Sequence, residues 1–293
     1  MYTKNKLSKF TQITMGVLIS ASIMSCGGNK QADSEDQQTT EDSSEPTATV
    51  EAEMQNYPLP SPLQIASIFK RAGMKYIDGV TNPISEAGKY SSNTSKALNL
   101  GVYSADLAYC TVNKQSQYSI NYIKISRQIG AELGMASVFE ANNLFARFEK
   151  NLSNEDSLTQ IIAELQMQTD LFMEDNEQEH VAAIIFAGAW TESMYIGAKV
   201  FENQKDPRIS SRLSEQMTIL KNIVGVLKMY QTKDPAIASL VTDFSAIQDS
   251  YLVSPSVKAL MADTTGAEIK LTDPELVSIS AKIAELRAKV VKG

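Results

Sequence analysis

The feature that most constrains this chain is a run of residues without charge in its second half. No charged side chain lies between Val181 and Thr191, inside the longer segment "EHVAAIIFAGAWTESMYIGAKVF" that spans residues 179–201. A helix that is apolar on all sides must be surrounded by other helices. We therefore expect an all-α domain in which this segment is a central helix.

Helical periodicity continues almost throughout the chain after Tyr57, and no segment alternates convincingly between apolar and polar residues. Pro207 and Pro235 each open a helix, while Asp273 and Pro274 form a cap and first-turn pair for the last one. The sequence thus predicts a bundle of about nine helices, over residues 60–80, 95–112, 116–134, 136–152, 154–173, 179–201, 207–230, from 235 onward and 273–291.

Two segments of the chain resemble each other. "GVYSADLAY" from Gly101 and "GAWTESMYI" from Gly188 share a glycine, an apolar residue, a large aromatic residue, a hydroxyl residue and a nearby acid. Each copy is preceded by one amphipathic helix and followed by two. We interpret this as internal duplication of a four-helix unit, with pseudo-repeats at about 57–150 and 151–252; chance similarity between two core helices is the alternative.

Glycines inside these two segments also favour a central helix pair. Gly101, Gly188 and Gly197 each cost about 1 kcal/mol relative to alanine in a helix interior. Close approach between helix backbones can offset that cost. We therefore expect the two glycine-containing helices to pack against each other at the centre of the domain.

Acidic residues interrupt both of the predicted central helices. Asp106 and Glu192 lie among apolar and aromatic neighbours, and a buried carboxylate is costly unless it is hydrogen-bonded. Tyrosine hydroxyls or an arginine such as Arg127 are the expected partners. One interpretation is helix-to-helix hydrogen bonding, and the other is a small polar ligand pocket where the repeats meet. The residues of that candidate pocket are Tyr103, Asp106, Trp190, Glu192 and Tyr195.

The sequence offers little for metal, cofactor or nucleophilic chemistry. His180 is the one histidine, and its spacing from Glu177 is half of a di-iron motif whose second half is missing, so we predict a solvated helix start there. Cys110, in "LAYCTV", is expected to be a small buried hydrophobic residue rather than a reactive thiol. Phosphate-binding glycine loops, dinucleotide fingerprints and calcium loops are missing from the sequence, so we predict no metal or cofactor.

The N-terminus has the pattern of a secretory signal over residues 1–25. Three lysines precede an uncharged stretch from Ile13 to Met24, which is too short to span a bilayer. The sequence Ile23-Met24-Ser25-Cys26 resembles a bacterial lipobox. The resemblance implies cleavage before Cys26 and a diacylglycerol, followed by further acylation, at this cysteine; an ordinary signal peptide with an incidental cysteine is the alternative.

An acidic segment follows the cysteine. Between Cys26 and Asn56 there are eight acidic residues and one basic residue, so residues 26–56 are predicted to be a disordered tether. Its start, "NKQADSED", resembles the surface-export signal of Bacteroidota lipoproteins, whereas a merely solvated linker is the other interpretation. We expect an outer-membrane lipoprotein with a helical domain over 57–293, and leave its periplasmic or surface-exposed face open.

Three motifs suggest a family resemblance over Tyr57 to about Val291. "YPLPSP", "KALNLGVYSADLAYC" and "GAWTESMYI" resemble an uncharacterised family of all-helical lipoproteins from Bacteroidota, which has no known activity to carry over. Imelysin-like helical lipoproteins share the compartment and the duplicated plan. Their glycine-histidine-glutamate motif would need a histidine near the position where Trp190 stands.

Two functional classes follow from these patterns. The folded part has 23 basic and 26 acidic residues without a dense basic run, so nucleic acid is not expected as a partner. The first class, which we favour, is a non-enzymatic binding or interaction module for an unknown small ligand or envelope protein. The second is a carboxylate-dependent envelope hydrolase that uses Asp106 or Glu192. Catalytic carboxylates should face a cleft that solvent can reach.

Overall fold

The computed structural model describes residues 59–261 and 269–293. These residues contain no β-strand, so the all-α class expected from the sequence is confirmed. The predicted signal peptide (1–25), the lipidated Cys26 and the tether (26–56) lie outside the described residues, and they stay predictions.

Most of the helices follow one another with short connections, and the segment between α2 and α3 is a long one. The Asn154 side chain caps one of them as expected, by accepting a hydrogen bond from the Ser157 N–H at 3.0 Å. The α-helices are α2 (Pro62–Arg71), α3 (Asn93–Val112), α4 (Ser116–Glu132), α5 (Ala136–Glu140), α6 (Leu144–Lys150), α7 (Glu155–Asp175), α8 (Glu179–Gln204), α9 (Pro207–Met217), α10 (Leu220–Tyr230), α11 (Pro235–Leu252), α12 (Pro255–Met261) and α13 (Asp273–Lys292). Short 3₁₀ helices are η1 (Ile84–Lys89) and η2 (Ala141–Asn143).

The first helix is shorter than predicted. It ends at Arg71 because Gly73 adopts a left-handed backbone (φ +97°) and the Met74 N–H returns to the Phe69 carbonyl at 3.1 Å. Residues 74–92, which we call the strap, then cross the bundle as an irregular segment with η1 inside it. The expectation that one helix spans residues 60–80, with Tyr76 and Ile77 in it, is therefore wrong.

Two further helices are interrupted. The helix predicted over 136–152 breaks where Asn142 (φ 50°) and Asn143 (φ 54°) take left-handed conformations, which asparagine tolerates better than most residues. The helix predicted over 207–230 tightens at Thr218, whose N–H bonds to the Glu215 carbonyl three residues back, and resumes as α10.

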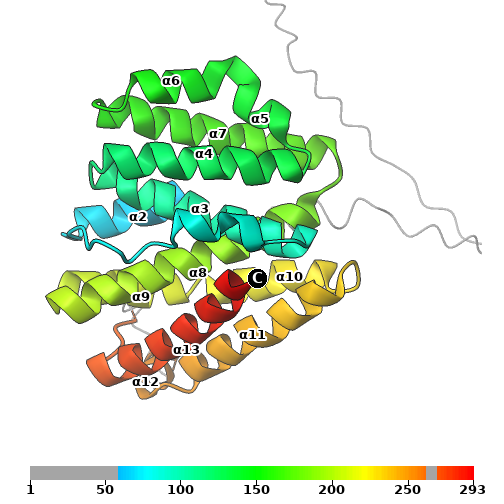
Figure 1. The fold of residues 1–293 in the computed structure, drawn as a ribbon. Coiled ribbons are helices and arrows are strands. Elements are labelled where there is room, and N and C mark those ends of the chain that lie inside the picture. The colour runs from blue at the N-terminus through cyan, green and yellow to red at the C-terminus, as the bar shows by residue number, and fades with distance from the viewer. Residues whose placement is uncertain (1–58, 262–268) are drawn as a thin grey trace, which may run out of the picture. The chain divides into compact units, whose positions relative to one another are not determined.

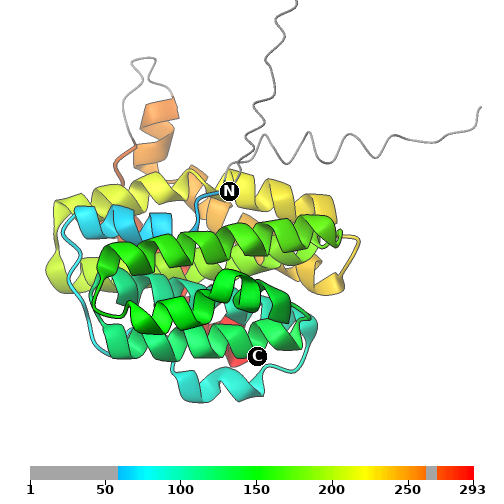
Figure 2. The same ribbon diagram turned by 90° about the horizontal axis from the view of Figure 1, so that it is seen from above.

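The C-terminal part also differs in detail. Helix α12 was not expected from the sequence, and in Figure 2 it stands out from the edge of the bundle. The N-cap of α13 is Thr272 rather than Asp273, since the Thr272 N–H donates to Glu275 at 2.7 Å in a capping box.

Helices α3 and α8 form the expected central pair. A Cβ atom on Gly101 would collide with the Ile185 carbonyl oxygen, and one on Gly188 would collide with the Leu98 carbonyl oxygen. The close backbone approach predicted for these two glycines is confirmed. Gly197 has another role, because its missing side chain leaves room for the Phe69 ring, 2.7 Å from a built Cβ.

The two central helices run in the same direction. The starts of both helices lie near Asp234. Thr94 Oγ1 on α3 donates to Asp234 Oδ2 at 2.6 Å, a bond that lowers the Asp234 pKa, and His180 on α8 lies close enough to lower it further. Near their ends, Asn113 and Gln204 both bond to the segment around the end of α2. Parallel packing brings residues at corresponding positions of the two helices together.

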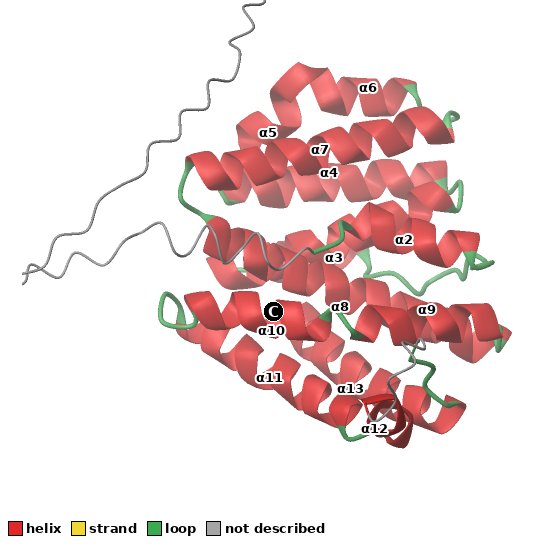
Figure 3. Ribbon diagram, turned by 180° about the vertical axis from the view of Figure 1, so that it is seen from behind, coloured by secondary structure: helices red, strands yellow, loops and turns green. Residues whose placement is uncertain are grey.

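The remaining helices cover this pair on opposite sides. In Figures 1 and 3, α4, α5, α6 and α7 lie on one side, and α9, α10, α11 and α13 lie on the other. Among the described residues, α8 alone is long and apolar enough to cross a membrane by length and composition. Protein buries 72% of its most apolar window, including Trp190 at 0% exposure, as expected for a central helix.

Candidate functional site

The two acids singled out in the sequence meet inside the bundle. Asp106 on α3 and Glu192 on α8 are both fully buried, and their side chains share a hydrogen bond. Each lies roughly one helical turn beyond the glycine of its own helix. Because the helices are parallel and touch at those glycines, the two carboxyl groups come together.

Arg287 on α13 completes the cluster. Its Nε donates to Glu192 Oε2 at 2.9 Å and its Nη2 donates to Glu192 Oε1 at 3.1 Å, a bidentate pair. The prediction that Arg127 is the partner of the buried acids is wrong, because Arg127 lies at the surface, 3.7 Å from Glu140. Arg287 is 95 residues from Glu192 in the chain and belongs to an ordinary amphipathic helix, so no local signal indicates it.

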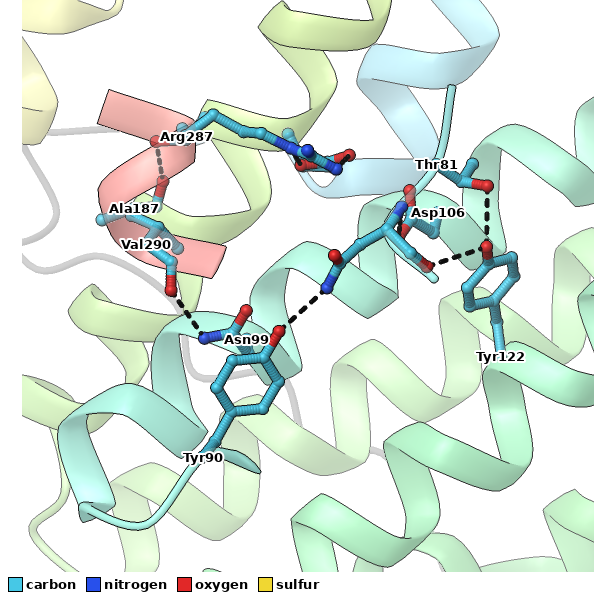
Figure 4. Close-up of polar contacts among 11 residues, drawn as sticks. Thr81, Tyr90, Asn99, Asp106, Tyr122, Ala187, Arg287 and Val290 are labelled. Carbon is cyan, nitrogen blue, oxygen red and sulfur yellow. Dashed lines mark hydrogen bonds and ion pairs between the residues drawn. The ribbon is translucent and has the colours of Figure 1, made fainter. Parts of the chain in front are cut away.

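Asp106 bonds to the strap rather than to a tyrosine hydroxyl. The Asn82 backbone N–H donates to its Oδ2 at 3.1 Å (Figure 4). Its Oδ1 is buried and accepts no hydrogen bond from the described residues. A protonated Asp106 carboxyl group can donate to Glu192, which gives each of the two acids a partner.

The charges of the cluster indicate where the proton resides. Burial raises the pKa of Asp106 well above its usual range, and the neighbouring Glu192 carboxylate raises it further, against the opposing effects of the Asn82 N–H and Arg287. Burial also raises the pKa of Glu192, while Arg287 opposes that rise. Two adjacent buried carboxyl groups cannot both ionise cheaply. Asp106 therefore holds the proton, and Glu192 is the anion paired with Arg287.

Tyrosine side chains hold the strap over the acid pair. Burial raises the pKa of Tyr103, Tyr109 and Tyr122, that of Tyr109 to about 12, so these hydroxyls stay protonated. Figure 4 shows Tyr122 reaching Thr81 on the strap, while Tyr90, which belongs to the strap, bonds to Asn82 within it. The bonds are Tyr103 Oη to Pro83 O at 3.0 Å, Tyr122 Oη to Thr81 Oγ1 at 2.7 Å and Asn82 O at 3.1 Å, Ile77 N to Tyr109 Oη at 2.7 Å, and Asn82 Nδ2 to Tyr90 Oη at 3.0 Å.

The other candidate pocket residues are only partly brought together. The Tyr195 ring lies under the Arg287 guanidinium, 4.5 Å from its centroid, and therefore borders the acid pair. Tyr103 serves the strap. Trp190 packs against Phe244 with ring centroids 5.8 Å apart, and its Nε1 has no hydrogen-bond partner among the described residues.

Neither acid lines either of the two neighbouring depressions. A shallow one of about 430 Å³ lies between the strap and α8, with Asp78, Tyr195 and Lys199 in its wall. A second, of about 10 Å³, lies among α2, α3 and α8 and is walled mainly by apolar residues such as Phe69 and Ile196. The acid pair is thus enclosed by protein, which supports the helix-to-helix hydrogen-bonding interpretation.

The cysteine and histidine occupy the positions expected for structural residues. Cys110 is buried, as predicted, and burial raises its pKa, which disfavours the thiolate. His180 is in the first turn of α8, half-buried rather than solvated, with its ring 6.3 Å from Tyr230. The described residues contain no group of three or more histidine, cysteine or acidic side chains placed to hold a metal ion.

Comparisons with protein-family models, curated proteins and solved structures found no match for this chain. The resemblance to Bacteroidota lipoproteins therefore rests on the motifs quoted above. The site is described by its own geometry: a neutral, enclosed Asp–Glu–Arg cluster that joins α3, α8, α13 and the strap.

Proposed function

We propose that this protein is a non-enzymatic helical binding or interaction module, attached to the outer membrane through lipidated Cys26. The observation that carries the proposal is the enclosure of Asp106 and Glu192, each at 0% exposure. A general acid or nucleophile must reach its substrate within hydrogen-bonding distance. Both acids instead use their oxygens to join three helices and the strap.

The alternative is an envelope hydrolase that uses Asp106 or Glu192. It would require the strap to lift, which breaks the Asn82 bond and the tyrosine bonds described above. The partly exposed Arg287, at 16% side-chain exposure, is the part of the cluster nearest to solvent. Its guanidinium is already engaged by both Glu192 oxygens.

We also infer that the domain is an internal duplication of a four-helix unit. Two contacts support this inference: Gly101 lies against the Ile185 carbonyl, and Gly188 lies against the Leu98 carbonyl. Leu98 and Ile185 are separated along the chain by the same number of residues as Gly101 and Gly188. The two contacts are therefore equivalent, with the two helices exchanged. Superposition of residues 57–150 on 151–252 from an experimental structure tests this, and unrelated helix paths would refute it.

A thermal-shift screen of the full chain against envelope glycans, peptides and neutral lipids tests the main proposal. A ligand at 100 times its Kd stabilises the folded state by about 2.7 kcal/mol. A binding module should give such a shift without turnover. Hydrolysis of ester, amide or glycoside substrates that is lost in both Asp106→Asn and Glu192→Gln, with folding retained, would favour the hydrolase instead.

A further inference from the structure

A cavity of about 50 Å³ enters the bundle between α2 and α7 and reaches the central helix α3. From Ala97 to Asn113 every residue of α3 and its C-cap is buried except Ser104, which is half-buried and lies in the cavity wall. The opening thus extends from the rim of the bundle to its central helix. It lies apart from the Asp106–Glu192–Arg287 cluster, which shares none of its lining residues.

The walls of this cavity carry no charged side chain. Charged residues make up 21% of the whole chain, so their absence from these walls indicates the kind of molecule that fits. Leu100, Leu107, Phe139 and Ile162 form much of the interior. An ionised group would lose its water there without gaining a counter-ion, so a bound molecule must be neutral.

Ser126 on α4 supplies a hydrogen-bonding group inside the cavity. Its side chain is 98% buried, since only 2% is exposed, and its Oγ has no partner among the described residues. An unpaired buried hydroxyl is destabilising. Ser104 Oγ, also in the wall, donates to the Leu100 carbonyl at 2.7 Å and keeps lone pairs that can accept. The cavity therefore offers a donor and an acceptor within an apolar surround.

We propose that this cavity binds the end of a neutral, unbranched aliphatic molecule that carries one hydroxyl or carbonyl group. The polar group pairs with Ser126, and the methylene groups contact the leucine and isoleucine side chains. Gln166 and Thr169 on α7 border the same cavity. Water is a poorer occupant, because a buried water needs two to four polar partners and most of the wall is apolar.

This inference rests on the proposed binding function and names its ligand class. The test uses the full chain carrying Cys26→Ala, so that no acyl anchor competes, with ¹³C-labelled leucine and isoleucine methyl groups. The probes are 1-pentanol and the pentanoate anion. We expect saturable methyl shifts at Leu100 and Ile162 with 1-pentanol, at least tenfold weaker ones with pentanoate, and none at Ile279 on α13.

Two variants make the test specific. Ser126→Ala removes the hydroxyl and should weaken 1-pentanol binding about fivefold, the effect of one hydrogen bond. Ala163→Phe places a ring at an exposed position in the cavity wall and should abolish the shifts, whereas Ala238→Phe, at an exposed position on α11, should leave them unchanged.

The proposal fails if 1-pentanol gives no saturable shifts, if the Ala163→Phe variant binds it normally, or if a crystal soaked in it shows water alone beside Ser126. The broader function is tested separately. A thermal shift from another ligand that persists in Ala163→Phe would support a binding module that uses a different site, and a failed 1-pentanol test beside it would reject this cavity alone.

Discussion

The Arg287 guanidinium faces the Glu192 carboxylate edge-on and donates to both oxygens, at 2.9 and 3.1 Å. Glu192 has no exposed surface, whereas Arg287 keeps 16% of its side chain exposed. The pair therefore joins the C-terminal helix α13 to the central helix α8 with the cation on the solvent side. Removing the cation leaves an anion in the interior, which costs more than removing a surface pair.

Arg287→Met should therefore destabilise the protein by about 3 to 5 kcal/mol in urea unfolding. Lys289→Met is the matched control, because Lys289 is on the same helix and pairs with Asp243 at 2.6 Å with 64% of its side chain exposed. That control should cost less than about 1 kcal/mol. Equal effects of the two substitutions would contradict an energetic role for the buried pair.

Asp106→Asn should alter how stability depends on pH. The folded pKa of Asp106 is raised, so the folded state holds a proton that the unfolded state releases above about pH 4. Stability should consequently fall as pH rises from there toward the folded pKa, by up to about 1.4 kcal/mol per pH unit. An asparagine amide can donate to Glu192 and accept from the Asn82 N–H, so the variant should lose this slope.

The measurement is the free energy of unfolding of both proteins between pH 5 and pH 8. The variant should gain relative to wild type as pH rises. A constant difference across this range would mean that Asp106 is ionised in the folded protein. Glu192→Gln serves for comparison, since it leaves the Arg287 charge unpaired and should destabilise at every pH in the range.

The sequence predicted the acid pair because Asp106 and Glu192 stand out as polar residues within two otherwise apolar helices. It did not indicate Arg287 or Asn82. Arg287 is one of several charged residues on an amphipathic helix, and Asn82 contributes through its backbone, so residue type carries no signal there. The first helix was predicted to extend beyond its observed end because apolar residues continue at helical spacing after Gly73.

Gly188→Leu should destabilise the protein strongly. A Cβ at this position collides with the backbone carbonyl of Leu98, which cannot move aside as a side chain can. Overpacking of this kind costs typically about 1 to 3 kcal/mol, and more where backbone must shift. Gly88→Leu is the control, because a Cβ there meets nothing within 4 Å. Normal stability of Gly188→Leu by thermal unfolding would refute the close helix contact.

Cys26→Ala tests the predicted anchor. Acyl chains on the cysteine hold a protein to a membrane by burying methylene groups, at about 0.8 kcal/mol each. The variant should move from the detergent phase to the aqueous phase while the helical domain keeps its circular dichroism spectrum. Unchanged partitioning would remove the lipoprotein assignment and leave the domain without an identified attachment.

Tyr122→Phe tests whether the strap is held by its tyrosine bonds. The substitution removes the hydroxyl that bonds to the Asn82 carbonyl at 3.1 Å and to Thr81 Oγ1 at 2.7 Å, while keeping the ring in place. Each lost hydrogen bond costs about 1 kcal/mol, so amide exchange at Asn82, whose N–H bonds to Asp106, should accelerate several-fold while amides of α8 exchange as before. Tyr251→Phe is the control, because the Tyr251 hydroxyl on α11 has no hydrogen-bond partner among the described residues. Equal exchange at Asn82 in the wild type and in Tyr122→Phe would show that the Tyr122 hydroxyl does not hold the strap.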